Sequence, residues 1–168
     1  PAAVRYPRGT GPGVATPDHL EPIEIGRAEW RRRGGGEATR VALLAFGSLN
    51  GPAAVVAERL EASHLNMRSI KPLDQTLVRR MTGRHELLVT VEDHQRMGGA
   101  GSAVNECLQD EGLLIPVLNL GLPDHFVYHG DREELLAAEG LDAAGIEAAI
   151  HARLEKMDAG RAEPYQAG

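Results

Sequence analysis

Residues 41–70 read VALLAFGSLN GPAAVVAERL EASHLNMRSI and contain a complete strand–helix–strand unit. The apolar run Val41–Phe46 is typical of a strand that is buried on both faces, as in a parallel sheet. A turn at residues 47–52 ends in a proline, and the pattern over residues 53–61 then predicts a helix. Residues 64–70 predict a second strand. Two strands joined by a helix form a βαβ unit, from which parallel sheets are built.

The same alternation continues toward the C-terminus. The next predicted segments are a helix capped by Asp74 and closed by Gly83, a strand over residues 86–92, a helix from Gly98 to about residue 110, and a strand over residues 115–120. Two helices follow, one from Asp131 to Gly140 and one from Asp142 to about Met157. The sequence therefore predicts an α/β fold with three layers, in which helices cover both faces of a mostly parallel sheet of about five strands.

The two ends of the chain have a different character. Residues 1–22 contain many prolines and glycines, which neither a helix nor a central strand tolerates. We interpret them as an extended linker that enters an α/β domain over residues 23–157. Residues 23–31 alternate in part and suit an antiparallel strand at the edge of the sheet. Residues 158–168 have little apolar content and are predicted to form a loose tail.

Composition limits the classes of function. The chain has 168 residues, which is enough for one domain with a substantial core. Its formal net charge of −6 disfavours nucleic acid as a partner. The longest apolar runs, residues 41–46 and 113–118, are far shorter than the roughly 20 residues that a membrane span needs. A signal segment is also lacking at the start of the sequence. We therefore expect no membrane partner and a cytoplasmic location.

Three segments suit the binding of an anion. Arg8 stands between Pro7 and Gly9, so a stiff loop would present its guanidinium to a phosphate or carboxylate, although loop arginines are also commonly just solvated. Gly98–Ser102 opens a helix, where free N–H groups attract anions, but a tight strand-to-helix turn explains the same glycines. Arg31–Gly36 combines arginines with glycines and suits either a phosphate contact or a solvated hairpin tip.

Other ionisable residues suggest catalysis or metal binding less specifically. Glu92, Asp93 and His94 follow a predicted strand and suit either acid–base chemistry at an interface or capping of a loop. His125 and His129 are four residues apart but lack an evident third ligand, so we predict no metal site. Cys107, the single cysteine, is interpreted as a buried structural thiol. The residue pattern identifies no catalytic, cofactor-binding or metal-ligating residue.

Several motifs together resemble one family in their order and spacing. These motifs are Arg5–Gly9, Asn66–Arg68 with Lys71–Asp74, Val91–Glu92 with Met97–Ser102, Gly121–Asp124 followed by His129–Gly130, and Gly140–Gly145. Over about residues 1–155 the chain is similar to the C-terminal region of the 1-deoxy-D-xylulose-5-phosphate synthase family. The last two motifs separate this family from general transketolases. Ser69 and Asp93–His94 depart from the family pattern, which leaves His94 without a supported role.

The resemblance implies an enzyme that uses thiamine diphosphate and Mg²⁺. Such an enzyme condenses pyruvate with D-glyceraldehyde 3-phosphate, releases CO₂, and supplies precursors of isoprenoids, thiamine and pyridoxal. In the family the cofactor contacts come from two preceding domains, which this chain lacks, so the isolated chain is expected to be inactive. The C-terminal domain packs against those domains and supports a homodimer. Arg8 matches the arginine that holds the phosphate of the aldehyde substrate.

The sequence is also compatible with two other functions. The chain could be a non-catalytic assembly subunit of a split transketolase-like complex. It could also be a stand-alone α/β domain that binds anions.

Overall fold

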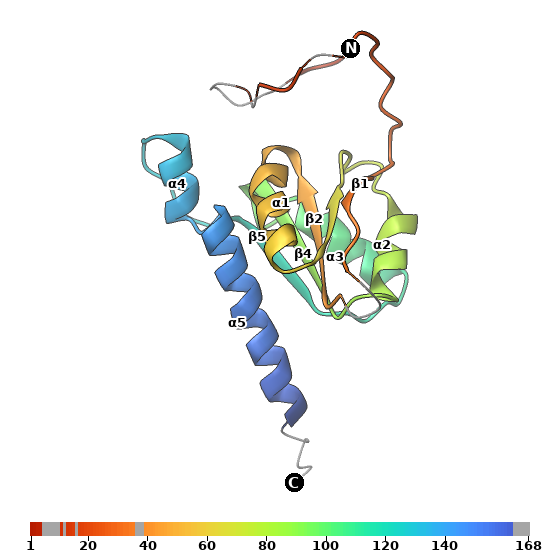
Figure 1. The fold of residues 1–168 in the computed structure, drawn as a ribbon, viewed down its shortest axis with the longest axis vertical. Helices are drawn as coiled ribbons and strands as arrows, with labels where there is room; N and C mark the ends of the chain where they lie inside the picture. The colour runs from red at the N-terminus through yellow and green to blue at the C-terminus, as the bar shows by residue number, and fades with distance from the viewer. Residues whose placement is uncertain (5–10, 12, 16, 36–38, 163–168) are drawn as a thin grey trace.

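A five-stranded sheet in the order β1-β3-β2-β4-β5 forms the centre of the molecule (Figure 1). The structure is a computed structural model that describes residues 1–4, 11, 13–15, 17–35 and 39–162. The strands are β1 (Glu29–Arg32), β2 (Val41–Phe46), β3 (Ser63–Asn66), β4 (Leu87–Gln95) and β5 (Val117–Leu122). The helices are α1 (Asn50–Arg59), α2 (Gln75–Thr82), α3 (Ala100–Asp110), α4 (Arg132–Ala138) and α5 (Ala143–Ala162), and a 3₁₀ turn, η1 (Gly47–Leu49), precedes α1.

Four of the strands are parallel and β1 is antiparallel at one edge. Strand β2 pairs in parallel with both β3 and β4, and β4 pairs in parallel with β5. Strand β1 pairs antiparallel with β3 and brings Glu29 opposite Asn66. The predicted fold class is therefore confirmed, including its antiparallel edge strand.

Helices of the chain itself cover both faces of the sheet. On one face α1, α4 and α5 pack on a fully buried apolar cluster that includes Leu43, Val56 and Ile146. On the other face α2 and α3 pack on a second cluster that includes Leu44 and Val104. Figure 1 shows α1 and α5 on the near side of the sheet. Neighbouring residues of β2 point to opposite faces and pack in different clusters. Both faces of the strand are therefore buried, which explains its unbroken apolar run.

Some predicted boundaries are wrong. Strand β3 ends at Asn66 instead of residue 70, because Arg68 has a φ of 56° and leads the chain out of the sheet. Strand β1 begins at Glu29 instead of residue 23. Strand β4 extends to Gln95, which pairs with Leu122 of β5.

The C-terminal helix is longer than its prediction. Helix α5 runs to Ala162, so residues 158–162 continue the helix and do not form the predicted loose tail. Ion pairs explain the extension: Asp158 accepts two hydrogen bonds from Arg40, and Arg161 lies 2.9 Å from a carboxylate oxygen of Glu86. These pairs fasten the last turns of α5 beside the start of β2 and β4. Among the helices that the structure describes, none is both long and apolar enough to cross a membrane.

The N-terminal segment reaches the domain at the carboxyl ends of the parallel strands. In the described parts of residues 1–22 there is no helix or strand. Because β1 is antiparallel, its first residue lies beside the last residue of β3. Asp74 fixes this point of arrival, since one carboxylate oxygen caps α2 at Leu77 N (2.9 Å) and the other accepts from Ala28 N (3.0 Å).

Candidate functional site

A cleft of about 530 Å³ opens at the carboxyl ends of β2 and β4. The two strands are neighbours, but β2 leads into α1 on one face of the sheet and β4 leads into α3 on the other. Their loops therefore diverge, and in open α/β sheets this is the position where ligands bind. We call it the carboxyl-edge cleft. Its lining includes Phe46, Gly47, Ile70, residues 92–94, and Gly98–Ala100.

Glu92 fixes the start of α3 at the base of this cleft. Its side chain is buried, and its two carboxylate oxygens accept hydrogen bonds from Ala100 N (2.6 Å) and Gly101 N (2.8 Å). A carboxylate is favourable here because the N-terminus of a helix carries partial positive charge. The N–H groups that were a candidate anion site in the sequence are thus occupied by the chain's own glutamate.

Close packing explains the glycines of the Gly98–Ser102 turn. A Cβ on Gly99 would overlap both Gln95 O and a carboxylate oxygen of Glu92. Gly98 has a φ of 72°, which side chains rarely adopt. The tight turn, one of the two alternatives drawn from the sequence, therefore describes this segment.

Asp93 and His94 have different environments from Glu92. Asp93 pairs with Arg132 of α4, and Ser48 donates to Asp93 at 3.2 Å. The ring of His94 lies on the surface, with Nδ1 3.4 Å from Gln95 O. The carboxylates of Glu92 and Asp93 thus bind different partners, so they do not form a catalytic pair. Glu92 and Asp93 instead hold α3 and α4 at this edge of the sheet.

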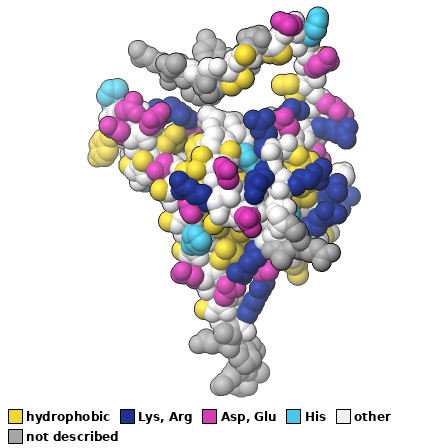
Figure 2. Space-filling model, in the orientation of Figure 1, with side chains coloured by type: hydrophobic (Ala, Val, Ile, Leu, Met, Phe, Trp, Pro, Cys, Tyr) yellow, Lys and Arg dark blue, Asp and Glu magenta, His cyan; other side chains and the backbone are white. Residues whose placement is uncertain are grey.

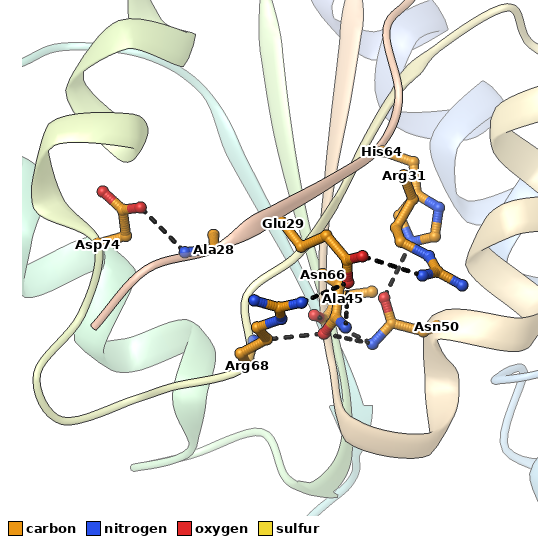
Figure 3. A network of polar contacts seen from close by, with 9 residues as sticks. All are labelled: Ala28, Glu29, Arg31, Ala45, Asn50, His64, Asn66, Arg68 and Asp74. Atoms are coloured by element: carbon orange, nitrogen blue, oxygen red, sulfur yellow. Dashed lines mark hydrogen bonds and ion pairs between the residues drawn. The ribbon is translucent and has the colours of Figure 1, made fainter. Parts of the chain in front are cut away.

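A polar network orders the neighbouring loop after β3 (Figure 3). Asn50 donates to Gly47 O at 2.9 Å and to Asn66 Oδ1 at 3.1 Å. Asn66 in turn accepts from Arg68 N and donates to Glu29. Arg68 and Glu29 form an ion pair at 3.2 Å. The network therefore joins β1, β3 and α1 at the point where the N-terminal segment arrives.

Two ionisable groups of this network have shifted pKa values. Burial opposes ionisation of Glu29, but the charges of Arg68 and Arg31 and hydrogen bonds from Asn66 and Arg31 outweigh it and hold the pKa of Glu29 below its usual value. Burial, with a smaller contribution from Arg31, lowers the pKa of His64 to about 4. His64 is therefore neutral at pH 7, and we assign its Nε2–H as the donor to Asn50 Oδ1 at 3.1 Å.

The other residues that the sequence singled out do not line the carboxyl-edge cleft among the described residues. Arg8, together with Arg5, lies outside the residues that the structure describes. Cys107 is buried on α3 as predicted, and burial raises the pKa of its thiol. His125 contacts Glu139 at 3.1 Å. Within residues 1–162, leaving aside the undescribed positions, no group of three or more His, Cys, Asp or Glu side chains is arranged to hold a metal ion.

Sequence reasoning missed the Asn50–His64–Asn66 contacts and the reach of Arg132 to the cleft. The Asn50 contacts link segments that are 14 and 16 residues apart, and Arg132 reaches Asp93 across 39 residues. Such contacts depend on how helices return to the sheet. Local residue patterns do not contain that information.

The carboxyl-edge cleft does not fit a thiamine diphosphate site. A diphosphate needs free N–H groups or cations, and Mg²⁺ needs a cluster of oxygen ligands. At the carboxyl-edge cleft the helix N–H groups are bound to Glu92, and the ionisable groups that line it are Glu92, Asp93, His94 and Glu106. The described lining contains no lysine or arginine, so this cleft offers neither free N–H groups nor cations to a diphosphate.

Comparison with known proteins places the chain in a family. Residues 29–146 match the family model described as "Transketolase, C-terminal domain". The chain is 62% identical over 157 residues to the 1-deoxy-D-xylulose-5-phosphate synthase of Chromohalobacter salexigens, a match that covers 92% of this chain and 23% of that protein. It is 56% identical over 157 residues to the enzyme of the same name from Pseudomonas aeruginosa, covering 94% and 24% respectively. The chain thus spans about a quarter of the length of these relatives.

A solved structure shares the fold. A chain described as "Split gene transketolase, inactive beta4 tetramer" superposes with a TM-score of 0.69 at 33% sequence identity. The match covers 77% of this chain and 42% of that one. Because the family model spans the sheet from β1 to β5 together with α1 to α4, the chain belongs to the transketolase C-terminal domain family.

Proposed function

We propose that this chain is the C-terminal domain of a 1-deoxy-D-xylulose-5-phosphate synthase. The observation that carries the proposal is the 62% identity to an enzyme of that name over 92% of this chain. The whole enzyme would condense pyruvate with D-glyceraldehyde 3-phosphate and release CO₂, in the cytoplasm. Thiamine diphosphate, with Mg²⁺, would supply the carbanion chemistry from parts of the enzyme outside this chain.

In this proposal the chain contributes scaffold, support of a homodimer and one substrate contact. The arrival of the linker at the carboxyl edge supports an arrangement in which the preceding domains meet that edge. Two apolar side chains there, Ile70 and Met97, are 51% and 69% exposed and would be covered in the contact. Glu92 would keep α3 in place, and the Asn50–Asn66–Arg68 network would keep the loop after β3 in place.

Synthesis of the product by the full-length protein tests the proposal. We expect 1-deoxy-D-xylulose 5-phosphate to form from pyruvate and D-glyceraldehyde 3-phosphate when thiamine diphosphate and Mg²⁺ are present. The 168-residue chain is expected to form none, because no group of its described residues is arranged to hold Mg²⁺ and the N–H groups at the start of α3 are bound to Glu92. A full-length protein that is folded and cofactor-loaded but joins pyruvate to no aldehyde would contradict the proposal.

Arg8 is proposed to hold the phosphate of the aldehyde substrate. We expect Arg8→Ala in the full-length enzyme to raise KM for D-glyceraldehyde 3-phosphate about tenfold, because a charge-assisted hydrogen bond to phosphate is lost. The KM for pyruvate should change less than twofold. Initial rates measured with each substrate varied in turn give both constants. The matched control is Arg27→Ala, whose native side chain pairs with Glu24 on the surface. Equal KM values for the aldehyde in Arg8→Ala and the wild type would remove Arg8 from the site.

A second candidate function is a non-catalytic assembly subunit of a split transketolase-like complex. The observation that favours it is the structural neighbour described as an inactive tetramer of a split-gene transketolase. This candidate predicts that the chain is encoded with its own start and restores activity only when a separate partner polypeptide is added. A single polypeptide about four times as long, with the activity above, favours the first proposal.

A further inference from the structure

A second cleft, of about 640 Å³, opens at the opposite edge of the sheet, where the parallel strands begin. We call it the amino-edge cleft. Its walls include Trp30 and Arg33 from the end of β1, Ser63 at the start of β3, and Arg84, His85 and Glu86 between α2 and β4. The volume is in the range of cavities that bind small molecules.

Among the described residues that line the amino-edge cleft, positive charge predominates. Glu86 is the single acidic residue among them, and Arg161 and Arg40 bind that carboxylate at 2.9 Å and 3.2 Å. The hydrogen bond from Arg161, followed by that from Arg40, outweighs burial and lowers the pKa of Glu86. Arg33 and Arg84, by contrast, have no carboxylate within 4.0 Å among the residues that the structure describes. Figure 2 shows Lys and Arg side chains gathered over β1 and α2 on the face in view.

The guanidinium of Arg33 is held in place. It stacks over the Trp30 ring, 4.4 Å from the ring centre, which is a cation–π contact. The backbone after it is fixed because Gly34 N donates to Ser63 Oγ at 3.2 Å. A Cβ on Gly34 would overlap the side chain of Thr39, so the chain turns closely here. The two arginines before it are already engaged: Arg31 pairs with Glu29, and Arg32 donates to Ala57 O at 3.1 Å.

A neutral histidine forms the floor of the cleft. Burial, opposed by a hydrogen bond to Met81 O and aided by the charge of Arg84, lowers the pKa of His85. We assign His85 Nδ1–H as the donor to Met81 O (3.0 Å), which leaves Nε2 to accept from Ser63 Oγ (2.9 Å). Both ring nitrogens are therefore occupied. Contacts to a ligand would fall on the guanidinium groups of Arg33 and Arg84.

We propose that the amino-edge cleft binds a small molecule that carries two anionic groups, phosphates or carboxylates, which Arg33 and Arg84 hold. Guanidinium forks suit both kinds of oxyanion. The described lining of the carboxyl-edge cleft contains no lysine or arginine, so that cleft offers no cation to hold the same ligand. The linker joins the domain at the other edge of the sheet, so its attachment leaves the amino-edge cleft open. This inference goes beyond the proposed function and does not depend on it.

Fluorescence of Trp30, the single tryptophan of the chain, reports on this cleft directly. The 168-residue chain, whose helices close both faces of its own sheet, is titrated with inorganic pyrophosphate and separately with citrate. NaCl keeps the ionic strength constant. We expect a saturable change in Trp30 emission with at least one of the two ligands. Tighter binding of pyrophosphate would identify a phosphate ligand, and tighter binding of citrate would identify a carboxylate ligand.

Variants tie the signal to the two arginines. Arg84→Gln should weaken binding about tenfold, because one charge-assisted contact is lost. Arg33→Gln should also weaken binding about tenfold. Its affinity is measured by calorimetry, because the loss of Arg33 also changes the surroundings of Trp30. The control is Arg80→Gln, an exposed arginine of α2 that does not line the cleft. An emission change that does not saturate, or equal weakening by Arg80→Gln, would overturn the proposal. Circular dichroism confirms that each variant is folded.

Discussion

Replacing Glu92 by alanine is expected to lower the free energy of unfolding by about 3 kcal/mol. The Glu92 carboxylate is buried and accepts hydrogen bonds from Ala100 N and Gly101 N at the start of α3. Its removal leaves two buried N–H groups without an acceptor, at a cost of roughly 1–3 kcal/mol each, and also removes a negative charge from the helix N-terminus. Urea unfolding of the 168-residue chain, followed by circular dichroism, measures the change.

The neighbouring residue in β4 provides the control. Asp93→Ala removes a carboxylate of the same edge, but Asp93 is partly exposed and pairs with Arg132 on the surface. Such pairs contribute about 0.2–1 kcal/mol, so this variant should unfold at nearly the wild-type urea concentration. Glu92→Gln should fall between the two variants, because an amide keeps one acceptor oxygen but has no charge. If Glu92→Ala and Asp93→Ala were equally stable, the anchoring role of Glu92 would be wrong.

The fold could be predicted from the sequence because a strand that is buried on both faces consists of apolar residues. The run Val41–Phe46 is entirely buried, and its residues alternate between the two core clusters. The start of a helix could also be predicted where a side chain caps it locally, as Asp74 does for α2 and Asp131 does for α4. These signals lie within a few residues of the feature that they predict.

Features that depend on distant residues could not be predicted in this way. The last turns of α5 are held by Arg40, which precedes Asp158 by 118 residues. The end of β3 follows from the positive φ of Arg68, a residue type that gives no local sign of it. The amino-edge cleft likewise combines β1 with the segment after α2. The Arg31–Gly36 segment suggested a phosphate contact. Arg84, the other arginine of the cleft, lies far from Arg33 in the sequence, so no local pattern shows that the two share a cleft.

Acid should destabilise the domain through His64 before it protonates the carboxylates. The pKa of His64 is about 4 in the folded chain and 6.5 in the unfolded chain, so the unfolded state binds the proton more tightly. The contribution of neutral His64 to the free energy of unfolding is therefore fully present above pH 6.5, and it is lost as the pH falls toward 4. The two pKa values give a loss of about 2 kcal/mol between pH 7.5 and pH 5, and a limiting loss of about 3 kcal/mol.

The physical cause is the polar network at the carboxyl edge. His64 is 1% exposed, and its neutral ring donates to Asn50, which in turn holds Asn66 (Figure 3). Protonation would place a buried positive charge near Arg31 without a compensating carboxylate contact to His64 among the described residues. Glu29, Glu86 and Asp158 have lowered pKa values, so they weaken the fold in a lower pH range, below about 4.5.

Urea unfolding at several pH values from 7.5 to 5 tests this expectation. In His64→Gln the amide N–H₂ can still donate to Asn50 Oδ1, but the side chain does not titrate. We expect this variant to lose some stability at pH 7.5 and to show a much flatter dependence on pH. His85 also has a lowered pKa, so the matched control is His85→Gln, which should keep most of the wild-type slope. Parallel pH dependences for the wild type and His64→Gln would mean that another group causes the acid destabilisation.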